Sequence, residues 1–157
     1  MIEIEIEDPR WRRRLPRVRA VVRQAAAAAA ARQGQTPTIA ILLASDETLA
    51  SLNHRFRGEA KETNVLAFPA PSPARALGDI AVAFGVCDRE AKEQGKPLCD
   101  HLRHLIIHGV LHLMGYDHQS SDEAARMEAI EIDLLDHLGV PDPYAGAARP
   151  IDDVHAS

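Results

Sequence analysis

Three histidines, His108, His112 and His118, have the spacing of a metal site. His108 and His112 are four residues apart, so on a helix their side chains share one face, about 6 Å apart along the axis. Gly115 can adopt the positive φ that ends a helix, and the chain can then bring His118 back towards the other two. Three neutral imidazoles with an open fourth position are typical of a catalytic zinc site. The sequence therefore predicts one zinc ion bound by these side chains.

Further histidines precede this set, and five of the eight in the chain fall within residues 101–118. Four share one helix face by their 3-4-4 spacing: His101, His104, His108 and His112. Burying imidazoles without partners costs about 1–3 kcal/mol each, and a bound metal relieves that cost. His104 and His108 form a second pair four residues apart, which stays an alternative. Because Gly115 precedes His118, we favour the later set as ligands, with the earlier histidines as supporting or surface groups.

The segment from His108 to His118 reads H-G-x-x-H-x-x-G-x-x-H. It resembles the zincin pattern H-E-x-x-H-x-x-G-x-x-H, in which the glutamate accepts a proton from the water on the metal. Gly109 replaces that glutamate, and glycine has no group that can accept a proton. The pattern thus predicts a zinc site without the base of a peptidase. Asp117 can orient a ligand through its second ring nitrogen, or it can cap its own turn.

Length and composition favour a single domain, residues 1–157, with one hydrophobic core. The chain is 46% hydrophobic and has a net charge of −5. Residues 1–60 hold ten Lys/Arg and seven Asp/Glu, whereas residues 61–157 hold eight and sixteen. A local basic surface can bind phosphate on an acidic protein. Candidates for RNA binding are Arg10, Arg13, Arg17 and Arg55, with solvated surface positions as the alternative.

The two cysteines, Cys87 and Cys99, predict reduced thiols instead of a disulfide framework. The first residues alternate between isoleucine and glutamate, unlike a secretory signal. The sequence has no apolar run of the length that spans a membrane. We therefore expect a cytoplasmic protein that does not associate with membranes.

Hydrophobic periodicity and turn residues predict an α+β (layered α/β) fold, with a small mixed sheet of about four strands and a zincin-like helix that bears the histidines. Strands are expected at residues 2–6, 38–44, 65–68 and 77–84. Helices are expected at residues 10–32, with a start near Pro16, and at 45–54, 86–94, 97–114 and 120–138. Ser120 and Glu123 form a capping box. Residues 141–157 are expected to form a loosely ordered tail.

Three blocks of sequence are similar to the YbeY family of bacterial rRNA-maturation endoribonucleases. They are Leu52–Gly58 (L-N-H-R-F-R-G), Thr63–Pro69 (T-N-V-L-A-F-P) with the later Gly78-Asp79-Ile80, and the histidine segment. Their order and spacing cover most of the chain. Ala67 stands where the family usually has serine, and Glu62 where proline is common.

The resemblance implies a zinc-dependent endoribonuclease that cuts single-stranded RNA in 16S rRNA 3′-end maturation and ribosome quality control. Arg57 and His108 would be catalytic, because a guanidinium pairs with phosphate through two hydrogen bonds and stabilises developing charge. Asp79 is, with Asp117, a candidate to orient a metal ligand. The expected partners are single-stranded rRNA and a ribosomal particle or protein. A metalloprotease-like hydrolase and a ribosome-assembly factor with a structural metal are the alternatives.

Overall fold

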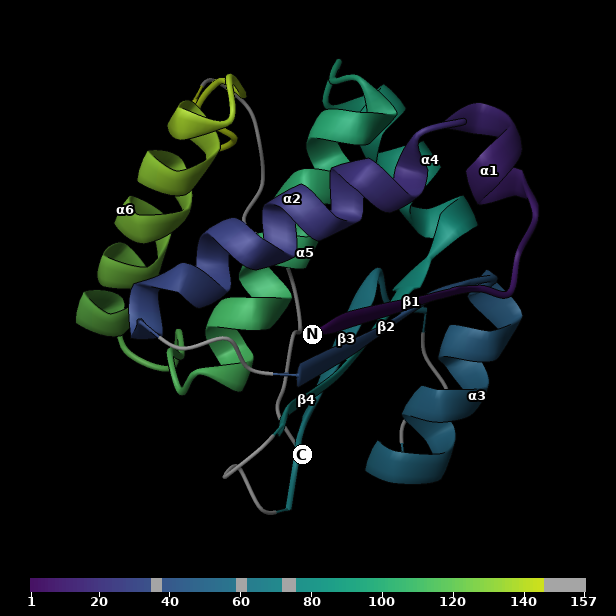
Figure 1. Cartoon of the computed structure of the whole chain (residues 1–157), viewed down its shortest axis with the longest axis horizontal. Coiled ribbons are helices and arrows are strands. Elements are labelled where there is room, and N and C mark those ends of the chain that lie inside the picture. Colours follow the sequence, from purple (N-terminus) through teal and green to yellow (C-terminus); the bar gives the residue numbers. More distant parts are fainter. Residues whose placement is uncertain (35–37, 59–61, 72–75, 146–157) are drawn as a thin grey trace.

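Four strands form one mixed sheet at the centre of the structure (Figure 1). Their bounds are Ile2–Ile6 for β1, Thr38–Ala44 for β2, Val65–Pro69 for β3 and Ala76–Ala83 for β4. The strand order is β1-β2-β4-β3, in which β1, β2 and β4 are parallel and β3 is antiparallel to β4. The computed structural model describes residues 1–34, 38–58, 62–71 and 76–145. Within them, no helix is long and apolar enough to cross a bilayer.

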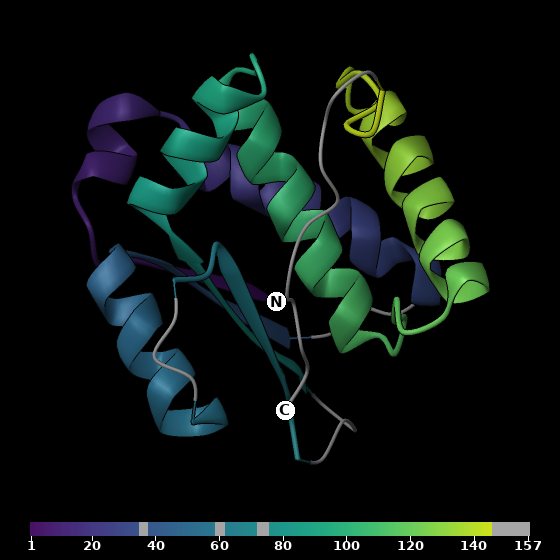
Figure 2. The ribbon, with the colours of Figure 1, turned by 180° about the vertical axis from the view of Figure 1, so that it is seen from behind.

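Helices cover both faces of this sheet, as the two opposite views show (Figures 1 and 2). Their bounds are Arg10–Arg14 for α1, Val18–Ala30 for α2, Asp46–Arg57 for α3, Phe84–Glu93 for α4, Leu98–Leu113 for α5 and Ser121–His137 for α6. A 3₁₀ turn, Ala31–Gln33, follows α2. The main core lies between the sheet and the layer of α2 and α5, while α3 packs on the other face. These layers confirm the predicted α+β class.

Alternate residues of β3 and β4 face opposite sides of the sheet. Val65 and Val82 belong to the core beneath α5. Leu66 and Ala81 belong to the smaller cluster beneath α3, together with Leu49 of that helix. Because side chains along a strand alternate between faces, residues 79–83 of β4 can each be assigned to one helix layer by position, whereas the register shift at the start of β4 interrupts the alternation before them.

The N-terminal helical region differs from the expected helix at residues 10–32, because it is divided at Pro16. Leu15 has φ −131° and ψ 87°, outside the helical region. A proline disfavours the helical conformation of the residue before it, and it has no N–H for the helix ladder. The first turn therefore becomes a separate helix, α1, which places Trp11 in the core. The indole N–H of Trp11 donates to Ala44 O at 3.0 Å.

Two helix ends follow their predicted capping signals, whereas α4 begins at Phe84, two residues before its expected start, and α3 ends later than expected. Ser45 and Ser120 cap α3 and α6, accepting from Thr48 N at 3.2 Å and Glu123 N at 3.1 Å. The helix α3 does not end near residue 54 but continues to Arg57, and Gly58 closes it with φ 70°. Parts of the expected loops (residues 35–37, 59–61 and 72–73) and residues 146–157 of the expected tail lie outside the described residues.

Candidate metal centre

The end of α5 and the turn after it bring the three predicted histidines together. Gly115 has φ 96°, and the N–H of Tyr116 donates to Leu111 O at 3.0 Å, so the chain reverses just beyond the helix. The reversal places the ring of His118 5.8 Å from that of His108 and 5.2 Å from that of His112, between centroids. One nitrogen of each ring lies within 4.8 Å of the others. This group can hold a metal ion.

The first two histidines of the cluster are buried, and each has a ring nitrogen available for a ligand. His108 is 4% exposed and His112 is 5% exposed. Burial, together with the neighbouring His108 and His118, lowers the pKa of His112 to about 3. The Nε2 atoms of His108 and His112 are buried and have no hydrogen-bond partner within the described part of the chain. Buried nitrogen lone pairs without partners fit a metal better than an apolar core.

A buried carboxylate from α6 orients the first histidine. Glu131 is 0% exposed, and its Oε2 accepts a short hydrogen bond from Nδ1 of His108. Its Oε1 accepts from Nε2 of His104 at 2.7 Å. Although burial raises the pKa of Glu131, the hydrogen bonds from His104 and His108 outweigh burial and hold it well below its usual range. An ionised Glu131 requires the proton of His108 on Nδ1, so Nε2 carries the lone pair towards the cluster.

Sequence reasoning did not identify Glu131. It lies on the face of α6 that carries Met127, Leu134 and Leu135, all of them buried. A glutamate on an otherwise apolar helix face is the signal that could have found it, because an ionisable residue is buried only with partners. The packing of α6 against α5 supplies those partners.

The two earlier histidines of α5 pair with carboxylates instead of joining the cluster. His104 contacts Glu131, and burial lowers the pKa of His104 to about 4. His101 Nε2 lies 2.9 Å from Oε1 of Glu90, which also accepts from the amide of Asn64 at 3.0 Å. One nitrogen of each of these rings is therefore paired with a carboxylate, whereas the other, Nδ1, is buried without a hydrogen-bond partner among the described residues.

The two aspartates predicted to orient a ligand lie in different places. Asp117 Oδ1 accepts from the backbone N–H of His118 at 2.7 Å, which is the turn-capping alternative. Asp79 is exposed and shares its strand face with Ala81, beneath α3, whereas the histidines lie on the α5 side of the sheet. Glu131, in contrast, contacts the ring of the candidate ligand His108.

Gly109, at the position of the zincin glutamate, faces the sheet. A Cβ built on it would lie 3.1 Å from Cδ1 of Ile80 and 3.4 Å from its Cγ1, tighter than ordinary van der Waals contact. The absence of a side chain allows α5 to approach β4 at this point. A glutamate here would begin its side chain against the core, and Ile80 would have to shift by a few tenths of an ångström to admit it.

The predicted arginines are spread over the molecule. Arg57 is half-buried in the last turn of α3. Arg55 lines a groove of about 1010 Å³ with Asp79, Phe68 and the exposed Phe56. Arg10 binds Asp8 at 2.7 Å and lies 4.7 Å from the ring centre of Phe84, while Arg13 and Arg17 are exposed at α1 and the start of α2.

Beside the histidine cluster is a small cavity of about 240 Å³. His108 and His118 form one part of its lining, and Glu128, Glu131 and Tyr144 form another. Burial raises the pKa of Glu128, and the charge of Glu131 raises it further. The cavity provides a space in which a small group can approach the cluster.

Comparisons with known proteins agree with the sequence resemblance. The family model described as Endoribonuclease YbeY matches residues 3–139. The chain is 51% identical to Endoribonuclease YbeY of Maricaulis maris over 145 residues, covering 91% of each chain. It is 44% identical to the protein of the same name from Bradyrhizobium diazoefficiens, covering 92% of this chain and 85% of that one.

A solved structure is similar in fold. The solution structure of TM1509 from Thermotoga maritima matches with a TM-score of 0.57 and 23% identity, covering 88% of this chain and 92% of that one. The family model and the curated relatives, each spanning most of the chain, show that it belongs to the endoribonuclease YbeY family.

Proposed function

We propose that this chain is a zinc-dependent, single-strand-specific endoribonuclease that acts in 16S rRNA 3′-end maturation and ribosome quality control. The observation that carries the proposal is the convergence of His108, His112 and His118 at the end of α5. Three imidazoles and an open position suit a catalytic zinc ion. Membership of the endoribonuclease YbeY family supports RNA as the substrate. With RNA as the substrate and a ribosomal partner, we expect the protein to act in the cytoplasm.

A zinc ion bound here would polarise a phosphate oxygen and acidify a water molecule. The residues of the chain prepare the site for it. His108 points its Nε2 lone pair into the cluster because Glu131 accepts the proton on Nδ1. His112, with a pKa of about 3, need not lose a proton at neutral pH before it binds a cation. His112 is therefore ready to bind a metal at the pH of a cell.

Arg57 is the proposed phosphate-binding group. Both α3 and α5 contact β3, which lies at the edge of the sheet. An RNA strand that crosses this edge can meet Arg57, at the end of α3, as well as the histidine cluster on the other side. A guanidinium forms paired hydrogen bonds with phosphate oxygens and stabilises the charge that develops there.

The packing at Gly109 disfavours the metalloprotease alternative. A zincin needs a glutamate at this helix position, and here the position faces Ile80 of the core. A reaction on a phosphodiester needs no base at residue 109, because the nucleophile can be activated elsewhere in the site. The experiment below also tests the other alternative, a ribosome-assembly factor with a structural metal.

The test is cleavage of a single-stranded RNA with the 16S 3′-end sequence by protein whose metal content has been measured. Zinc-loaded wild type should cut this RNA and leave the same sequence intact when it is paired in a duplex. Replacing Arg57 with alanine should reduce the rate about 100-fold, as the loss of one charge-stabilising donor does. His112→Ala should lose both metal and cleavage.

Arg32→Ala is the matched control, because Arg32 is exposed in the 3₁₀ turn after α2 and should cut as wild type does. If Arg57→Ala and His112→Ala both cut as fast as the parent, the proposal is wrong. If zinc-bound wild type cuts neither free RNA nor RNA in ribosomal particles, the assembly-factor alternative replaces it. Zinc, nickel and iron should be compared in the same assay, because imidazoles bind each of them.

A further inference from the structure

The chain after α6 returns to the histidine cluster through a short segment, residues 140–145, which we name the C-terminal strap. Val140 begins it, with a buried side chain and an N–H that donates to Leu135 O at 2.9 Å. Asp142 then forms a turn, because its Oδ1 accepts from the N–H of Tyr144 at 2.8 Å. The N–H of Ala145 donates to the carbonyl of Asp142 at 3.3 Å. The strap therefore has a defined conformation that directs Tyr144 inward.

Tyr144 contacts the carboxylate that orients the candidate ligand. Its hydroxyl donates a short hydrogen bond to Oε1 of Glu131 and lies 3.1 Å from Nε2 of His104. Its ring meets that of His104 edge to face, with 5.3 Å between centroids. Tyr144 also lines the cavity beside His108 and His118. A chain of contacts thus runs from the strap through Glu131 to His108.

We propose that the C-terminal strap fixes the metal centre, and that Tyr144 is a positioning residue that holds Glu131 against His108. The inference rests on the metal site proposed above and adds a residue 26 positions beyond the last candidate ligand, His118 to Tyr144. Residues that bind the ligands of a metal through hydrogen bonds commonly change its affinity 10–100-fold. The sequence pattern of the histidines does not indicate that the metal site depends on Tyr144.

The geometry explains why Glu131 needs the tyrosine. Its carboxylate is fully buried, and a buried charge must have hydrogen-bond donors on both oxygens. Oε2 receives its donor from His108, and Oε1 receives two, from His104 and Tyr144. With the hydroxyl removed, Oε1 keeps a single donor, and rotation of the carboxylate would weaken the bond to His108. The orientation of the Nε2 lone pair would then be less well fixed.

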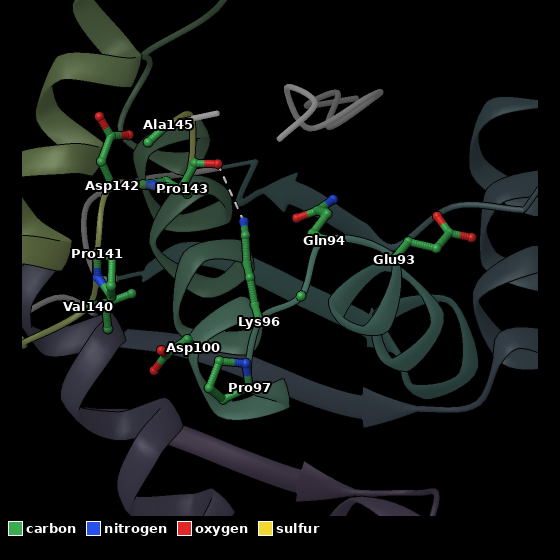
Figure 3. A pocket seen from close by; sticks show the side chains of 11 residues that line it. Glu93, Gln94, Lys96, Pro97, Asp100, Val140, Pro141, Asp142, Pro143 and Ala145 are labelled. Atoms are coloured by element: carbon green, nitrogen blue, oxygen red, sulfur yellow. Dashed lines mark hydrogen bonds between the residues drawn. The ribbon is translucent and has the colours of Figure 1, made fainter. Parts of the chain in front are cut away.

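The outer side of the strap is supported by a lysine. Lys96, in the turn between α4 and α5, donates from Nζ to the carbonyl of Pro143 at 3.5 Å (Figure 3). Around this contact is a cavity of about 500 Å³, with Glu93 and Gln94 on one side and Asp142 and Ala145 on the other. Because the cavity leaves the strap loosely packed here, the lysine should help to keep Tyr144 in place.

Zinc affinity is the direct test, measured by competition with a coloured chelator on the full chain. Tyr144→Phe should weaken zinc binding about tenfold, Glu131→Gln between tenfold and 100-fold, and Lys96→Met by less than Tyr144→Phe. The matched controls are Tyr116→Phe, which removes the hydroxyl of the chain's other tyrosine, and Glu123→Gln, an exposed position of α6. Both controls should bind zinc as wild type does.

A second readout separates positioning from stability. In the metal-free protein, the ¹⁵N shifts of His108 should report a proton on Nδ1 in wild type and mixed tautomers in Tyr144→Phe. If Tyr144→Phe keeps both the wild-type affinity and the single tautomer, the strap does not position the site. If wild type itself binds no zinc, the proposed function fails instead. Because Tyr144→Phe removes one oxygen atom, it tests the inference even if Glu131→Gln does not fold.

Discussion

The missing side chain of Gly109 makes room for Ile80, whose Cδ1 would lie 3.1 Å from a Cβ at residue 109. The pair marks a close approach of α5 to β4 directly beneath the histidine cluster. The position that a zincin uses for its base is thus used here for packing. The same position therefore bears on both the type of reaction and the packing of the core, and substitutions of Gly109 and Ile80 test both.

Substitutions of Gly109 and Ile80 should have non-additive effects on the free energy of unfolding. Gly109→Glu should destabilise the protein by about 1–3 kcal/mol through overpacking and should create no peptidase activity. Gly109→Ala should destabilise the wild-type protein, because its Cβ would press on Cδ1 of Ile80. In an Ile80→Val background this methyl group is absent, so the same substitution should stabilise the protein by up to about 1 kcal/mol, since alanine favours a helix. Urea unfolding of the four variants measures the coupling. Additive effects would show that residue 109 does not press on Ile80.

Acid should destabilise the metal-free protein. Burial lowers the pKa of His104 to about 4 in the folded state, so between about pH 6.5 and pH 4 the unfolded chain binds the extra proton. Stability therefore falls as the pH drops through this window, by on the order of 3 kcal/mol for this group. Glu131, with its pKa held low, contributes a further loss below about pH 4.5.

The measurement for this prediction is urea unfolding in the presence of a chelator at pH 7 and at pH 5. His104→Gln retains a polar group near Glu131 but does not titrate in this range, so its stability should depend less on pH. Equal pH dependence in wild type and His104→Gln would contradict the assignment.

Metal binding should stabilise the folded state. At a free zinc concentration 1,000 times the Kd, the gain is about 4 kcal/mol for a site present only in the folded protein. Removing zinc with a chelator should lower the Tm of wild type, whereas His112→Ala should respond little to either treatment. His137→Ala is the control, because His137 is exposed at the end of α6 and should keep the full response. A loss of response in the control alone would place the metal elsewhere.

The cap of α6 should contribute to the site, because that helix carries Glu131. Ser120→Ala removes the acceptor for the N–H of Glu123 and should cost about 1 kcal/mol of stability. Ser121→Ala, one residue later and inside the helix, should have little effect. Thermal unfolding of the two variants makes the comparison. Similar losses in both would indicate that the cap is not the cause.

The local part of this site was predictable, and the part made by packing was not. The spacing of His108, His112 and His118 and the position of Gly115 are enough to predict the cluster, because a helix and one turn determine its geometry. Glu131 depends on how α6 packs against α5, which periodicity does not describe. Pro16 indicated a break between two helices, but the apolar pattern on both sides of it suggested one continuous helix. The side of the sheet on which Asp79 lies depends on how its strand packs between the helix layers, which the sequence alone does not show.

The three histidines all lie within residues 108–118, so closing the loops between them costs little chain entropy even in an unfolded chain. A newly made chain could therefore hold zinc weakly as soon as this stretch has been synthesised, before α6 and Tyr144 follow. Metal held in that way lowers the free energy of the unfolded chain as well, which reduces the stabilisation expected from affinity alone. The later segments would then turn a weak local chelate into a site with a fixed geometry.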